Sequence, residues 1–95
     1  MIRKLRDMNN NSNKKIINDI QSNIPAVVMQ AIISGIDNRV TDESFIDAIK
    51  KHKDDETCLL NVPISYVAKA ALDVLGAETY NGKNEQIKNM INAWK

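Results

Sequence analysis

The most apolar stretch of the chain is residues 24–36, with the sequence IPAVVMQAIISGI. Pro25 suits the first turn of a helix, where a backbone N–H has no partner within the helix. Apolar side chains follow around most of the circumference, and only Gln30 and Ser34 form a polar strip one turn apart. Because a helix that is apolar nearly all round must be covered by its neighbours, these residues predict a central, buried helix.

Amphipathic helices are predicted on both sides of this stretch. Residues 13–23 place isoleucines at helical spacing, which indicates a narrow apolar stripe. Residues 42–53 follow Thr41, a good N-cap residue. Val40 and Phe45 are spaced to pack on each other across the start of that helix as a hydrophobic staple.

Two further helices are predicted nearer the end of the chain. Residues 65–75 form a wide apolar arc, and Gly76 is expected to end that helix in the left-handed conformation. Asn84 is expected to cap a last helix. The apolar stripe of this last helix consists of Ile87, Met90, Ile91 and Trp94.

The fold class predicted from these patterns is all-α, a compact five-helix domain. Its helices would pack either as hairpins or as an irregular bundle. A chain of 95 residues suffices for one domain with a modest core. Hydrophobic residues make up 43% of the chain at a net charge of +1, which is too apolar for a disordered protein.

The composition also predicts a cytoplasmic protein with no membrane association. The single cysteine cannot form an internal disulfide, and this favours a reducing compartment. No apolar run reaches the length of a signal peptide or of a membrane span. The many Asn, Ile and Lys residues are typical of AT-rich genomes and indicate a bacterial source.

A shift of 39 residues superimposes the apolar pattern of residues 28–36 on that of residues 67–75. Residues 67–76, VAKAALDVLG, resemble the first helix of a HEAT repeat, and residues 87–91, IKNMI, resemble the second helix. Repeats of about 40 residues built from two helices are typical of this class. The resemblance implies stacked helical hairpins that present a surface to a protein partner, and it carries no catalytic residues.

Residues 1–11 are predicted to form a flexible basic arm before a helical domain over residues 12–95. Basic side chains can neutralise nucleic-acid phosphates. The candidate nucleic-acid contacts are Arg3, Lys4, Arg6, Lys14 and Lys15. The alternative hypothesis is therefore a DNA-associated accessory protein of a bacterial chromosome or mobile element. It is placed second because no aromatic residues lie between the basic ones for base stacking.

The sharpest predicted surface feature is a strip of Tyr66, Lys69 and Asp73 on the helix over residues 65–75. Their spacing places them on one side of the helix, away from its apolar arc. A tyrosine among charged neighbours is a candidate contact for a protein partner. The alternative is a surface pair of Lys69 with Asp73, with Tyr66 packed on a loop.

His52 and Cys58 are the residues on which an enzyme could be built. His52 is expected to be half-buried near the end of its helix. Cys58 is expected to be a buried thiol in a short extra turn over residues 58–60 that plugs the core. A nucleophilic Cys58–His52 dyad is the less favoured alternative. The acidic residues 54–56 lack the spacing of a calcium loop.

The first functional hypothesis is therefore a small, non-enzymatic protein–protein interaction module. It would bind through the outer faces of the helices predicted over residues 42–53 and 65–75 and of the last helix, and a homodimer is one such arrangement. No catalytic residue, cofactor or metal site is predicted.

Overall fold

The computed structural model describes residues 14–95, which are mainly helical and carry one small β-hairpin. The all-α expectation is therefore confirmed apart from this hairpin. The predicted arm, with Arg3, Lys4 and Arg6, lies outside the described residues. The described elements are a helical segment over residues 14–19, α2 (Pro25–Asp37), α3 (Glu43–Lys51), β1 (Cys58–Leu59), β2 (Val62–Pro63), α4 (Ile64–Val74) and α5 (Glu85–Trp94).

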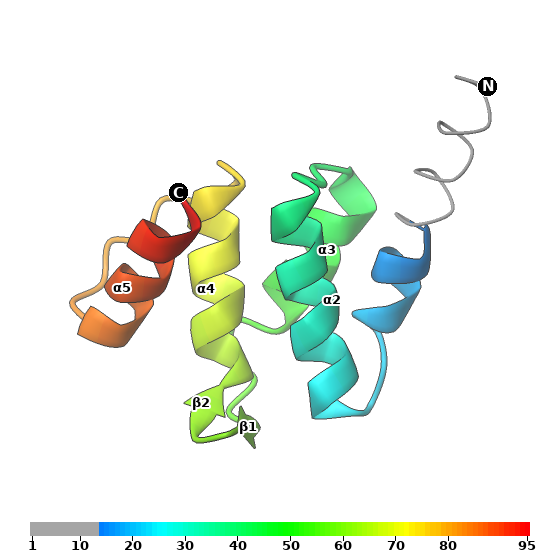
Figure 1. The fold of residues 1–95 in the computed structure, drawn as a ribbon, viewed down its shortest axis with the longest axis horizontal. Helices are drawn as coiled ribbons and strands as arrows, with labels where there is room; N and C mark the ends of the chain where they lie inside the picture. Colours follow the sequence, from blue (N-terminus) through cyan, green and yellow to red (C-terminus); the bar gives the residue numbers. More distant parts are fainter. Residues whose placement is uncertain (1–13) are drawn as a thin grey trace.

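Helix α4 occupies the centre of the arrangement. It contacts α2 and α3 on one side and α5 on the other (Figure 1). No residue of α4 is fully exposed. Helix α2 leaves one side open, which carries Ala26, Gln30, Ile33 and Asp37. The prediction that residues 25–36 form the central helix is therefore wrong, because no other element within residues 14–95 covers the outer side of α2.

Helices α2, α4 and α5 end at the same end of the molecule (Figure 1). Arg39, just after α2, donates from Nη2 to the carbonyl oxygen of Trp94 at 3.2 Å. Lys95 Nζ lies 3.2 Å from Asp73 Oδ1, near the end of α4. Helices α4 and α5 therefore run in the same general direction, whereas the resemblance to a HEAT repeat implies an antiparallel pair.

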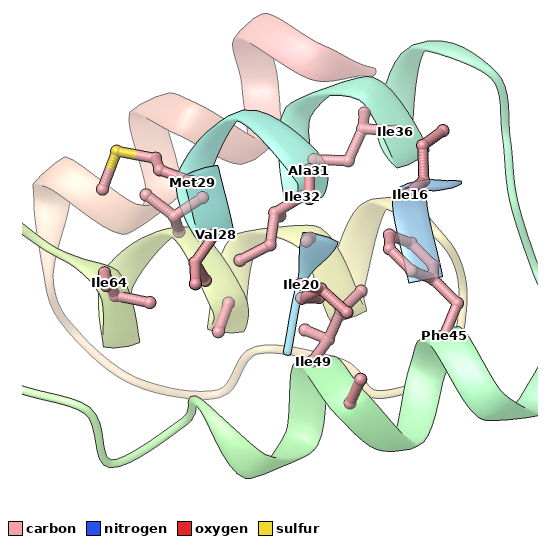
Figure 2. Packing of buried hydrophobic residues seen from close by; sticks show 14 of the residues in the cluster. Ile16, Ile20, Val28, Met29, Ala31, Ile32, Ile36, Phe45, Ile49 and Ile64 are labelled. Atoms are coloured by element: carbon pink, nitrogen blue, oxygen red, sulfur yellow. The ribbon is translucent and has the colours of Figure 1, made fainter. Parts of the chain in front are cut away.

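The core is aliphatic, with a single buried aromatic ring. Ile20, Ile32 and Ile49 are fully buried and lie close together in Figure 2. Phe45 of α3 is also fully buried, and its ring lies against Gly35 of α2. A Cβ at Gly35 would lie 2.1 Å from Phe45 Cζ, so only glycine permits this close approach.

The expected end of α4 is confirmed. Gly76 has a φ of 78°, in the left-handed region. The N–H of Ala77 donates to the carbonyl of Leu72 at 2.9 Å, and the N–H of Gly76 donates to the carbonyl of Asp73 at 3.0 Å. These two hydrogen bonds form the Schellman arrangement that satisfies the last carbonyls of a helix.

The predicted helix starts have different outcomes. Asn84 caps α5 as expected, because its side chain accepts a hydrogen bond from the N–H of Ile87 at 3.1 Å. Thr41 does not cap α3, whose N-cap is Asp42 without a side-chain cap bond. Val40 is still buried, in the same core cluster as Phe45.

The predicted extra turn at residues 58–60 is wrong, because these residues belong to a β-hairpin. Leu59 pairs with Val62 across a two-residue turn. Both turn residues, Leu60 and Asn61, have positive φ values, 53° and 67°. These are the φ signs of the type I′ turn, whose twist matches that of paired strands. Cys58, predicted to be buried, is exposed because its strand lies at the surface.

Candidate functional site

The strip predicted on α4 is not an open surface. Tyr66, Lys69 and Asp73 are all only partly exposed. Tyr66 packs against a small cluster that contains Ile87 and Ile91 of α5. The prediction of an exposed strip is therefore wrong, because α5 and the loop before it return over this side of α4.

Asp73 contacts both the loop after α4 and the end of α5. Its Oδ2 accepts a hydrogen bond from the N–H of Tyr80 at 2.8 Å, and its Oδ1 pairs with Lys95. The Tyr80 N–H, followed by the hydrogen bond and charge of Lys95, holds the pKa of Asp73 below its ordinary value. Asp73 therefore fixes the loop and the end of α5 to α4, and its observed ion-pair partner is Lys95 instead of Lys69.

Lys69 lines a hollow of about 200 Å³ between α4, the segment after α3 and the loop after α4. The lining residues are Lys53, Lys69, Glu78, Thr79, Tyr80 and Asn81. Lys53 Nζ lies 2.7 Å from Glu78 Oε1, and Lys50 Nζ lies 3.9 Å from Glu78 Oε2. The hydrogen bond from Lys53 is the main cause of a lowered pKa of Glu78. Charged groups from three separate segments thus meet at this hollow.

His52 is half-buried, as expected, and both of its ring nitrogens have partners. Nδ1 lies 3.1 Å from Asp55 Oδ2, and Nε2 lies 2.9 Å from the carbonyl oxygen of Ile20. Cys58 instead donates a long hydrogen bond, 3.5 Å, to the carbonyl of Glu56. The structure therefore does not bring Cys58 and His52 together as a hydrogen-bonded dyad. His52 ties the end of α3 to the segment before α2.

The hairpin turn carries the most exposed large apolar side chain of the described residues. Leu60 is 89% exposed, and Ile24, just before α2, is 59% exposed. The hairpin contacts α2 through β1 and lies at the end where α2 begins (Figure 1). Sequence reasoning missed this surface, because leucine is not a usual residue at a turn position with positive φ.

Of the predicted nucleic-acid contacts, only Lys14 and Lys15 fall among the described residues, and both are exposed. Lys15 borders a groove of about 470 Å³ between the segment over residues 14–19 and α2. Asp19 lies on the same groove, so its negative charge partly balances the positive charge of Lys15. These two lysines do not form an extended basic surface with other described groups of the groove.

Comparison of the chain with protein-family models, curated proteins and solved structures finds no match. Across residues 14–95, no helix is long and apolar enough to cross a membrane. The same residues contain no group of three or more His, Cys, Asp or Glu side chains that could hold a metal ion.

Proposed function

We propose that the protein is a small, non-enzymatic interaction module that binds a protein partner through the hairpin end of the molecule. The observation that carries this proposal is Leu60, an apolar side chain at the tip of a turn that is 89% exposed in the structure of residues 14–95. Exposed apolar side chains that gather at one place on a folded protein are typical of interaction surfaces. Ile24 adds a second such side chain at the same end.

The backbone at Leu60 strengthens the proposal. A residue with a side chain at positive φ costs about 1 kcal/mol, and glycine or asparagine relieves most of this cost. Leu60 has this conformation, and its side chain is 89% exposed, so packing within the molecule returns little of the cost. Strained and exposed residues of this kind occur preferentially at functional sites.

The resemblance to HEAT repeats, which present surfaces to protein partners, does not carry this proposal, because such a repeat is an antiparallel pair of helices and α4 and α5 run in the same general direction. Because of this shared direction, residues 14–95 do not form a stack of two antiparallel hairpins. An irregular bundle that carries an interaction surface is therefore the form that we propose.

The test is the substitution Leu60→Asn, compared with Ile33→Gln on the open side of α2. Asparagine tolerates positive φ, so we expect Leu60→Asn to raise the free energy of unfolding by up to about 1 kcal/mol. We also expect it to weaken capture of a protein partner from the native cells at least tenfold, measured by quantitative mass spectrometry.

Ile33→Gln removes a partly exposed apolar side chain elsewhere and should leave capture unchanged. Greater stability together with weaker capture separates a binding role of Leu60 from a structural role. Equal capture by wild type and Leu60→Asn would refute the proposal. Sedimentation velocity of the purified protein then shows whether the partner is a second copy of this chain.

A further inference from the structure

We propose that the hollow lined by Lys53, Lys69 and the loop over residues 78–81 binds a phosphate group. The hollow and the hairpin tip share no residues, so this site goes beyond the interaction proposed above. Its ligand chemistry is that of inorganic phosphate or a phosphate monoester.

The charges around the hollow favour an anion. Lys50, Lys53 and Lys69 supply three ammonium groups, and Glu78 is the one carboxylate among the lining residues. The adjacent carboxylate, Asp73, already accepts from the Tyr80 N–H and pairs with Lys95. Lys69 has no ion-pair partner within 4.0 Å among the described residues. The cluster therefore has a surplus of positive charge that an anion would neutralise.

The wall of the hollow is already fixed in place. The N–H of Glu78 donates to the carbonyl of Leu72 at 3.1 Å, as part of the α4 terminus. Tyr80 is held at both ends, because its N–H donates to Asp73 and its hydroxyl accepts from the N–H of Asn84 at 3.1 Å. A wall that is ordered before the ligand arrives reduces the entropic cost of binding.

The Tyr80 ring is also packed closely by the next loop residues. A Cβ at Gly82 would lie 2.3 Å from the Tyr80 hydroxyl oxygen, so glycine lets the backbone lie against the ring. Thr79 and Asn81 also line the hollow, and a threonine hydroxyl and an asparagine amide are groups that can donate hydrogen bonds. Lysine ammonium groups with neutral donors are a common arrangement for phosphate oxygens.

Glu78 gives the proposal a feature that can be tested. Its carboxylate now neutralises Lys53 at 2.7 Å and Lys50 at 3.9 Å. An incoming phosphate would compete with this carboxylate for the same ammonium groups. Removal of the Glu78 charge should therefore tighten phosphate binding, whereas removal of a lysine charge should weaken it.

The experiment is an NMR titration of the full chain with inorganic phosphate and with methyl phosphate at constant ionic strength. We expect saturable shifts at residues 78–81. Lys69→Gln and Lys53→Gln should each weaken binding at least fivefold, and Glu78→Gln should tighten it at least threefold. Lys88→Gln, an exposed charge on α5 outside the lining, should have no effect. Circular dichroism checks that each variant is folded.

The two titrants separate the sources of the phosphate group. Binding of both supports a monoester as the ligand, and binding of inorganic phosphate alone supports the free anion. An acetate titration tests selectivity, because equal affinity for acetate would overturn a phosphate site. Shifts that do not saturate, or equal weakening by Lys88→Gln and Lys69→Gln, would also overturn it. Leu60→Asn should bind phosphate normally, so this test fails or succeeds independently of the proposed partner surface.

Discussion

Helices α2 and α4 have superimposable apolar patterns but different surroundings. Under the 39-residue shift, Ile33 corresponds to Leu72, yet Ile33 is 38% exposed and Leu72 is 1% exposed. Helix α4 is covered by α2, α3 and α5, whereas α2 has one open side. The comparison shows that an apolar pattern defines which side chains can be buried, and that the neighbouring elements determine which of them are.

The same comparison extends to the polar and small residues. Ser34 of α2 corresponds to Asp73 of α4, which holds the following loop and the end of α5. Gly35 corresponds to Val74, and Gly35 lies against the buried ring of Phe45. The two helices therefore use matching positions for different contacts, and each pair of positions gives a test.

The largest expected effect comes from Leu72 compared with Ile33. Leu72→Ala should lower the free energy of unfolding by about 2–5 kcal/mol, because it leaves a cavity in the fully covered helix. Ile33→Ala should change it by less than about 1 kcal/mol, because the side chain is partly in water already. Urea unfolding followed by circular dichroism measures both values. Equal losses would show that α2 is as fully covered as α4.

The next effect is a clash that exists only on α2. In Gly35→Ala, the new methyl group must displace the buried Phe45 ring, at a cost of about 1–3 kcal/mol. The better helix propensity of alanine returns about 1 kcal/mol at most, so we expect a net loss of stability. Val74→Ala at the matching position is the control, and it creates no clash. A Gly35→Ala variant that is more stable than wild type would rule out the close approach of α2 and α3.

The smallest effect concerns Asp73 and acid. Its folded pKa lies below the ordinary value of 3.8, first because of the Tyr80 N–H and then because of Lys95. A lowered carboxylate pKa stabilises the fold above the unfolded value, and this contribution is lost as the pH falls through the folded pKa. Asp73→Asn should therefore lower stability near neutral pH by about 0.5–1.5 kcal/mol and flatten the acid dependence below about pH 4.

Urea unfolding at neutral and acidic pH measures this difference. Asp37→Asn, an exposed carboxylate at the end of α2, is the matched control and should behave like wild type. An unchanged acid dependence in Asp73→Asn would show that Asp73 does not link the loop to α4.

The features that could be predicted from the sequence are those with local causes. Asn84 caps α5, and Gly76 ends α4, because each satisfies backbone groups within a few residues. The hairpin could not be predicted, since Leu60 has a conformation that leucine seldom adopts. The predicted exposure of the Tyr66–Asp73 strip is also wrong, because the cover comes from α5, a separate helix that lies further along the sequence.

The candidate sites also combine features with a local cause and features that depend on distant segments of the chain. The sequence identifies Lys69 by its place on a helix, but it does not identify the residues next to Lys69 in the hollow. Lys53 and Glu78 come from other segments, and only their meeting creates a charged hollow. No spacing in the sequence predicts that meeting, because it depends on the path of the loop after α4.

The sequence by itself determined the helices, their apolar stripes and two of their ends, because hydrogen bonding and side-chain spacing within a helix are local. The tertiary structure alone decided that α4 is the central helix, that Leu60 and Cys58 face outward, and that Lys53, Lys69 and Glu78 lie together. Those outcomes depend on which distant segments compete to cover the same apolar surface, and that competition is settled only when the whole chain packs.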